Sequence, residues 1–286
     1  MPKAKKRKQP IVSDPNSNLN SSTAAQACRN VIRQYHVLLK RRKQLENDSQ
    51  LHQQSLAHID DQIKALGGLE RYQQLSVLGQ REERGGGSEK ILINWMEELN
   101  LHHVYGAEHR LRLLEVGALK PDNFQSSSLW IDSMPIDLRS RHPNIIEQDF
   151  LLLDQKQHRH KWDAISLSLV LNFVPVPVDR GRMLQLAYRF LAPDGLLFLA
   201  LPLPCVANSR YLTFDSLKRL LEAIGFMEKR ARWRENGKMG YWLYQKTAVP
   251  KTLAHSFDKK VALRTGHRNN FAILLNEGAR QEDHGP

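Results

Sequence analysis

Arg112-Leu113-Leu114-Glu115-Val116-Gly117-Ala118 is an apolar run that ends in an acid and a glycine, and Leu129-Trp130-Ile131-Asp132 brings a second acid fifteen residues after that glycine. In a doubly wound α/β sheet, strand ends of this kind meet at the crevice where nucleotide-like ligands bind. Gly117 lets the backbone approach a ligand without a side chain in the way. Asp132 lies near the spacing, roughly 20 residues, at which dinucleotide-binding folds place the acid that accepts hydrogen bonds from ribose hydroxyls. The two segments therefore predict a nucleoside site at the ends of the first two strands.

The chain after this pair continues the pattern of a mostly parallel, Rossmann-like α/β sheet with one antiparallel strand. Gly195–Leu201 is a nearly continuous apolar strand, as expected where helices cover both faces of a parallel sheet. Thr213 is placed to cap a helix that Gly225 closes. The other predicted strands are 111–116, 129–131, a short segment in 145–150, the first half of 162–174, 230–233, 241–245 and an edge strand at 271–275, and further helices are predicted over 92–99 and 179–191.

The N-terminal part of the chain is mostly polar, and we expect it to lie outside the sheet domain. Residues 1–22 are basic and then rich in Ser, Asn and Pro, so we expect a disordered basic tail. Residues 23–84 carry two amphipathic helical patterns, the second ending at Gly67-Gly68, and form a predicted helical accessory segment. Its basic face either clamps RNA or is simply solvated. The sheet domain is predicted over 85–276, and 277–286 is a second disordered tail.

The charge balance favours a polyanionic partner. Lys and Arg outnumber Asp and Glu by 42 to 30, a net charge of +12, which suits nucleic acid or an anionic surface; plain solubility is the alternative. The cluster Lys3–Lys8 fits a nuclear or nucleolar address or a nucleic-acid-binding tail, although an inert tail is nearly as compatible. Cys28 and Cys205 show no ligand spacing, so we expect a reducing compartment and no metal site. No apolar run reaches the roughly 18 residues of a membrane helix.

The glycine pattern narrows the choice of cofactor. Gly117 stands alone, without the Gly-x-Gly-x-x-Gly of NAD sites or the Gly-x-x-x-x-Gly-Lys-Ser/Thr of triphosphate sites. A single glycine plus acids fits a cofactor that has an adenosine but no phosphates, of which S-adenosylmethionine is the common one. Gly117 would then give access to the methionine portion, Asp132 would bind the ribose, and Glu115 would orient the loop or the ammonium group. Asp149 would meet the adenine amino group, with Phe150 against the ring. The alternative is an ordinary strand-end turn.

The segment Asn172-Phe173-Val174-Pro175 is the candidate substrate site. Asn172 would hydrogen-bond the Watson–Crick edge of an extruded base and Phe173 would stack on it, although core packing is an equal alternative for Phe173. The segment stands where amino-methylating enzymes carry Asn/Asp-Pro-Pro-aromatic, and it departs from that element at two positions. Exocyclic amino methylation is therefore disfavoured. Arg180 and Arg182 either meet phosphates or are solvated.

Several segments in combination resemble the fungal large-subunit (25S) rRNA adenine-N1 methyltransferase family. The resemblance runs from about Val31 to Leu275 and implies a class I S-adenosylmethionine-dependent fold, in which Gly117 and Asp132 carry the cofactor contacts. It also implies a nucleolar enzyme that methylates N1 of an adenine in 25S rRNA during ribosome biogenesis. The segments are Leu66-Gly67-Gly68-Leu69-Glu70-Arg71-Tyr72-Gln73, Leu114-Glu115-Val116-Gly117, Ile131-Asp132, Asp149-Phe150 and Ser168-Leu169-Val170-Leu171-Asn172-Phe173-Val174-Pro175.

Two other functions remain open at this point. The metazoan relative of this family is a non-catalytic S-adenosylmethionine sensor, so a sensor that binds partner proteins is the main alternative. A ribosome-assembly scaffold without any cofactor is the third. A sensor needs neither RNA affinity nor a basic tail, so Lys3–Lys8 and the basic helices favour the enzyme. We expect a monomer that acts on rRNA or the pre-ribosomal particle, without a metal and without a membrane.

Overall fold

The computed structural model describes residues 30–45 in part and residues 53–79, 87–140, 142–235, 237–247 and 257–275. The chain divides into two compact units, Met1–Leu78 and Gly79–Pro286. The two predicted tails, 1–22 and 277–286, lie outside the described residues, as does Asn236 between the predicted strands 230–233 and 241–245.

The N-terminal unit consists of helices in its described part. α2 (Gln53–Ala65) ends just before Gly67, as predicted, and the φ of +89° at Gly67 is a left-handed conformation that glycine adopts without strain. α3 (Gly68–Gly79) follows at once, although the sequence pattern suggested no element there. Inside the unit the rings of Tyr35 and Tyr72 stack at 5.0 Å.

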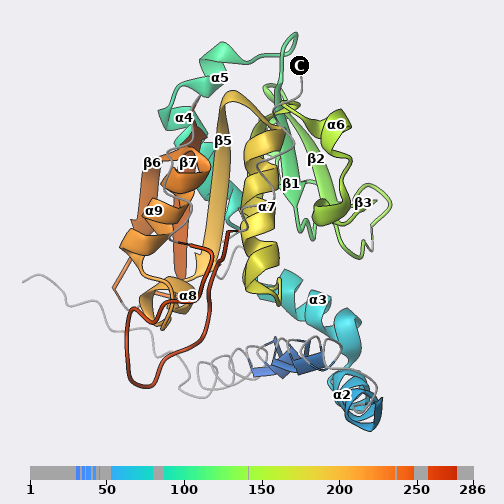
Figure 1. The fold of residues 1–286 in the computed structure, drawn as a ribbon. Coiled ribbons are helices and arrows are strands. Elements are labelled where there is room, and N and C mark those ends of the chain that lie inside the picture. The colour runs from blue at the N-terminus through green and yellow to red at the C-terminus, as the bar shows by residue number, and fades with distance from the viewer. Residues whose placement is uncertain are drawn as a thin grey trace, which may run out of the picture. The chain divides into compact units, whose positions relative to one another are not determined.

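The second unit is built on a seven-stranded sheet with the order β3-β2-β1-β4-β5-β7-β6 in its described part (Figure 1). β1 to β5 are parallel, and β7 is antiparallel to both of its neighbours, β5 and β6. The Rossmann-like sheet with one antiparallel strand is therefore confirmed. The strands are β1 (Leu111–Val116), β2 (Ile131–Asp137), β3 (Ile146–Glu147), β4 (Trp162–Ser168), β5 (Leu191–Pro202), β6 (Phe226–Trp233) and β7 (Met239–Lys246).

Helices cover both faces of this sheet, because successive strand residues point to opposite sides. One face packs against α7 (Pro177–Phe190) and α9 (Phe214–Ile224), and the other packs against α4 (Glu89–Glu98) (Figure 1). The start of α9 was predicted correctly because it depends on a local signal. Thr213 and Ser216 form a reciprocal capping box there. Shorter helical segments are α5 (Leu101–Val104), η3 (Gln125–Ser127), η4 (Phe150–Leu152), α6 (Gln155–His158) and α8 (Pro204–Ala207).

Two predicted elements differ from the observed ones. β5 begins at Leu191, four residues before the predicted start at Gly195, and Pro193-Asp194-Gly195 form a bulge inside the strand, with Asp194 at φ +60°. The edge strand predicted over 271–275 is wrong. This segment is buried but pairs with no strand, because its backbone bonds elsewhere: Leu274 donates to the Pro177 carbonyl at the start of α7. Its apolar side chains complete the core under α7 and do not extend the sheet.

Candidate active site at the carboxyl ends of the strands

Gly117 lies directly after β1, at the edge where the parallel strands end. Its φ of +76° is a conformation that side-chain-bearing residues adopt only with strain, and an added Cβ would lie 3.0 Å from Val170 Cγ2. The N–H groups of Gly117 and Ala118 both donate to the Ile136 carbonyl, at 2.8 and 3.1 Å. The predicted strand-end position of Gly117 is confirmed, and the absence of a side chain lets Val170 pack against its backbone.

Asp132 does not lie at this edge, so the predicted position of this carboxylate is wrong. It is the second residue of β2 and is opposite Arg112, near the beginning of β1. Its side chain is 59% exposed and lies 3.7 Å from Arg110. The apolar residues Leu129 and Trp130 belong to the turn before β2, and the strand continues well beyond Asp132. Asp132 therefore stands at the amino edge of the sheet, opposite to Gly117.

Asp137 occupies the position that Asp132 was expected to take. It is the last residue of β2 and follows Ile136, the residue whose carbonyl holds the Gly117 turn. Its Oδ1 accepts the Arg139 N–H at 2.9 Å. Burial raises the pKa of the Asp137 carboxyl, and that hydrogen bond from Arg139 partly offsets the effect. A usable signal was present, because Asp137 lies 20 residues after Gly117, closer to the expected spacing than Asp132.

Glu115 is buried in β1 beside the same turn, with 8% of its surface exposed. Its Oε1 accepts a hydrogen bond of 2.6 Å from Nδ2 of Asn123, a residue that the sequence analysis did not single out. Burial raises the pKa of Glu115 to about 7; the bond from Asn123 lowers it, and the charges of Glu89 and Asp122 raise it further. This hydrogen bond connects Glu115 to the loop after Gly117, in line with the first of its two predicted roles, the orientation of that loop.

Asp149 and Phe150 follow β3 at the same edge but have different surroundings. The Asp149 carboxylate caps η4 by accepting a hydrogen bond from the Leu151 N–H at 2.8 Å, and Asp149 is only partly buried. Phe150 is 3% exposed and packs edge-on against Phe190, with ring centroids 5.7 Å apart. The expectation that its ring stands against an adenine is corrected, because the ring is part of the core under α7. A role of Asp149 toward the cofactor stays a prediction.

The loop after β4 contains the predicted substrate residues. Leu169 has φ +57°, and the Phe173 N–H donates to the Val170 carbonyl at 2.9 Å, so the loop is a tight turn. Asn172 Oδ1 is buried and has no hydrogen-bond partner among the described residues. A buried acceptor without a donor is costly, and this oxygen therefore marks a place where a ligand donor would be stabilised. Phe173 is half-buried.

Arg180 holds this loop in place, which contradicts the predicted contact with phosphates. It is 2% exposed, and its guanidinium donates to the carbonyls of Val174 at 2.8 Å, Pro175 at 3.1 Å and Ala272 at 2.5 Å. Burial lowers the pKa of Arg180 to about 10. Arg182 is exposed, and its guanidinium lies 3.4 Å from the Leu151 carbonyl, a long contact. Arg180 thus connects the substrate loop to the C-terminal segment.

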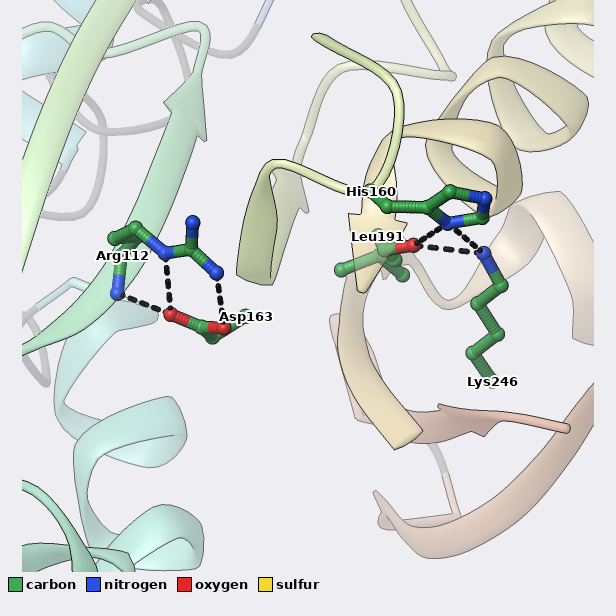
Figure 2. A network of polar contacts seen from close by, with 5 residues as sticks. All are labelled: Arg112, His160, Asp163, Leu191 and Lys246. Carbon is green, nitrogen blue, oxygen red and sulfur yellow. Dashed lines mark hydrogen bonds and ion pairs between the residues drawn. The ribbon is translucent and has the colours of Figure 1, made fainter. Parts of the chain in front are cut away.

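At the opposite, amino edge of the sheet, polar contacts connect neighbouring strands (Figure 2). The Arg112 backbone and guanidinium donate to the Asp163 carboxylate at 2.8 to 2.9 Å; burial raises the pKa of Asp163, but these bonds outweigh it and the net shift is downward. Lys246 Nζ donates to the Leu191 carbonyl at 2.7 Å and lies 3.1 Å from His160 Nδ1. These contacts join β1 to β4 and β7 to β5, so we assign them to the fold.

Among the described residues, no group of three His, Cys, Asp or Glu side chains is arranged to hold a metal ion. No helix in the described ranges has both the length and the apolar character needed to cross a bilayer.

Comparisons with known proteins show the family to which this chain is similar. The family model described as "25S rRNA (adenine(2142)-N(1))-methyltransferase, Bmt2" matches residues 57–273. A Saccharomyces cerevisiae protein named 25S rRNA (adenine(2142)-N(1))-methyltransferase is 38% identical over 223 residues, which are 77% of this chain and 64% of that protein. A Schizosaccharomyces pombe protein named 25S rRNA adenine-N(1) methyltransferase is 33% identical over 249 residues, 85% of this chain and 89% of that protein. The matched region thus spans just under two thirds of the length of the budding-yeast relative.

Solved structures give more distant matches. A Burkholderia thailandensis 1,6-didemethyltoxoflavin-N1-methyltransferase with bound 1,6-didemethyltoxoflavin and S-adenosylhomocysteine is 14% identical, with a TM-score of 0.40. The match covers 61% of this chain and 87% of that one.

Proposed function

The chain belongs to the 25S rRNA (adenine(2142)-N(1))-methyltransferase family, and from this membership we propose that it transfers a methyl group from S-adenosylmethionine to N1 of an adenine in 25S rRNA. The observation that carries the proposal is the family match over residues 57–273, which contains every strand-end residue described above. The whole activity is a proposal for this chain because the match leaves about a third of the budding-yeast relative uncovered.

The residues at the carboxyl edge fit this cofactor. Gly117 has a positive φ and no side chain at this edge, and we assign the methionine portion of the cofactor to its backbone. We assign the hydrogen bonds from the two ribose hydroxyls to Asp137, the last residue of the adjacent strand β2. Asp149 is the residue we propose for the adenine amino group. When bound, S-adenosylmethionine supplies an electrophilic methyl group on a sulfonium centre.

Asn172 and Phe173 are the residues that we propose for the target base. The unpaired Asn172 Oδ1 accepts hydrogen bonds, and the exocyclic amino group of adenine donates them, whereas guanine presents an acceptor at the same place. Asn172 would therefore select adenine and fix its edge, while Phe173 stacks on the extruded ring. N1 of neutral adenine already carries a free lone pair, so no side chain has to remove a proton. Positioning of N1 supplies most of the acceleration.

The cellular setting is part of the same proposal. The basic cluster Lys3–Lys8 and the net charge of +12 support an address in the nucleus, specifically the nucleolus, and a contact with the pre-ribosomal particle. We propose that the protein acts there as a monomer during ribosome biogenesis.

Methylation of unmodified rRNA tests the function and the site together. The full chain, S-adenosylmethionine and in vitro transcribed 25S rRNA should yield N1-methyladenosine, detected by mass spectrometry of nucleosides. Asp137→Ala should abolish the product and the thermal stabilisation by S-adenosylmethionine, because ligand binding to the folded state raises stability by mass action. Asp132→Ala is the matched control and should retain both, since Asp132 lies at the other edge of the sheet.

Two outcomes would contradict the proposal separately. No N1-methyladenosine from a wild-type protein that is stabilised by S-adenosylmethionine would reject the enzyme and leave the sensor. Loss of cofactor binding in Asp132→Ala, with Asp137→Ala unaffected, would reject the assignment of the site.

A further inference from the structure

The hairpin formed by β6 and β7 ends at the same edge of the sheet as the candidate active site. β7 is antiparallel to β5, and β6 is antiparallel to β7, so β6 runs in the direction of β5. Trp233, the last residue of β6, is opposite Gly240, and Gly240 is opposite Leu201 near the end of β5. The tip of this hairpin therefore projects from the carboxyl edge.

The hairpin tip is also close to the substrate loop when measured across the sheet. Ser168, the last residue of β4, is in register with Ala200, which is in register with Tyr241, and Tyr241 is opposite Arg232. Three strand spacings of about 4.8 Å place Arg232 about 14 Å from the end of β4. An RNA strand whose target base enters beside Asn172 crosses such a distance within a few nucleotides.

Exposed cations are concentrated at this tip, beside one exposed acid, Glu235. Arg232, Arg234 and Lys238 are all exposed, and none has an ion pair with a residue in the described ranges. Arg230, one step further from the tip, differs because it lies 3.7 Å from Glu98. Charged residues on an edge strand also protect against aggregation, which is the purely structural explanation.

Trp233 is the feature that edge protection does not explain. The residue is 44% exposed although it has one of the largest apolar side chains of the unit. It stacks on Phe214 at 4.6 Å with an interplanar angle of 21°, and Trp242 lies behind it at 6.2 Å. The inner rings hold the outer one in a fixed orientation, with arginines on both sides in the sequence. Arg232 precedes the ring in β6 and points to the opposite face of the strand, whereas Arg234 follows the ring in the chain. An exposed ring held at the edge strand can stack on a base of an RNA that passes over this edge, while these cations contact its phosphates.

We propose that this tip, defined as Arg232, Trp233, Arg234 and Lys238, binds the single-stranded RNA that flanks the target adenine. The proposal rests on the proposed function, because it assigns part of the RNA contact to a surface next to the same site. Arg232, Arg234 and Lys238 contact phosphates, and Trp233 provides a stacking platform for one flanking base.

Fluorescence anisotropy of the full chain with a short labelled single-stranded RNA of mixed sequence tests the surface. Arg232→Glu combined with Arg234→Glu should weaken binding about tenfold or more and reduce the salt dependence by about 0.7 per lost phosphate contact. Lys156→Glu combined with Lys218→Glu is the control: both lysines are exposed, the change in net charge is the same, and neither is at the hairpin. Trp233→Leu keeps an apolar cover over Phe214 and should weaken binding about fivefold or more by loss of stacking.

Thermal stabilisation by S-adenosylmethionine, measured on every variant, reports that the fold and the cofactor site are intact. Equal weakening in the hairpin and control pairs would mean that only net charge matters and would overturn the proposal, as would unchanged RNA binding in the hairpin pair. A wild-type protein that methylates 25S rRNA while the hairpin variants keep full RNA affinity rejects this surface alone. A wild-type protein that neither binds nor methylates RNA rejects the proposed function with it.

Discussion

Glu115 and Arg180 are buried ionisable side chains on either side of the candidate site, and each holds a loop. Glu115 accepts from Asn123 and so fixes the turn after Gly117. Arg180 donates to the carbonyls of Val174 and Pro175 and so fixes the turn after Asn172. The cost of burying these groups appears in their pKa values, raised to about 7 for Glu115 and lowered to about 10 for Arg180. Both loops are therefore held in position before any ligand arrives.

Replacing Glu115 should change how stability depends on pH. The pKa of Glu115 is about 7 in the folded chain against 4.5 in the unfolded chain, so folding favours the protonated form. Its contribution is fully present below pH 4.5 and is lost as the pH rises to 7, by about 3 kcal/mol in total. Glu115→Gln keeps an acceptor for Asn123 but cannot ionise. Urea unfolding at pH 5 and pH 8 should show a smaller loss of stability in Glu115→Gln than in wild type, and parallel losses would contradict the raised pKa.

Removing the guanidinium of Arg180 should destabilise the protein strongly. Arg180→Met fills a similar volume but leaves the carbonyls of Val174, Pro175 and Ala272 without their donor, which should lower the free energy of unfolding by about 2 to 4 kcal/mol. Arg182→Met is the control, because Arg182 is exposed with one long contact and should change stability by less than about 0.5 kcal/mol. Denaturant titrations that give equal effects for the two variants would show that Arg180 holds nothing.

At the scale of elements, the C-terminal segment 271–275 packs against α7 and covers the core beneath this helix. Ser209 Oγ donates to the Phe271 carbonyl, and the Leu274 N–H donates to the Pro177 carbonyl, so the segment is held at two points along its length. Phe271 and Ile273 are both buried in the core under α7. Such a close approach is possible because α7 presents a glycine, Gly181, toward the segment.

A methyl group at Gly181 should force the two elements apart. The Cβ of an alanine would lie 1.8 Å from the Leu274 carbonyl oxygen, a backbone atom that can move only if the segment moves. Gly181→Ala should destabilise the protein by about 1 to 3 kcal/mol, despite the better helix propensity of alanine. Gly106→Ala meets nothing within 4 Å and should leave the melting temperature almost unchanged. A stabilised Gly181→Ala variant would show that the segment is not packed on α7.

At the scale of the whole molecule, the net charge should make the binding of RNA depend more strongly on salt than the binding of S-adenosylmethionine. With a net charge of +12, binding of RNA releases counterions, whereas binding of S-adenosylmethionine depends on local contacts. If four phosphates are contacted, RNA affinity should fall by about 50-fold between about 50 and 200 mM salt. The affinity for S-adenosylmethionine, measured by calorimetry in the same buffers, should change by less than about threefold. An RNA affinity insensitive to salt would exclude a phosphate-contacting surface.

The architecture was predictable from sequence because it depends on local signals. The capped helix from Phe214 to Ile224, the buried β4 and β5 runs and the hairpin before Lys246 each carry their own periodicity, caps or turns. Gly117 was found for the same reason, since a glycine directly after an apolar strand marks a turn with few alternatives.

The site itself needed contacts between residues far apart in the chain. Asp132 and Asp137 both follow an apolar residue, and only the pairing of β2 with β1 shows that the strand passes the first acid and ends at the second. Phe150 and Arg180 are residue types that often bind ligands. In this protein the Phe150 ring packs against Phe190, and the Arg180 guanidinium donates to the Ala272 carbonyl. Strand ends are set by long-range hydrogen bonds and burial by partners distant in sequence, so neither can be read from a local pattern.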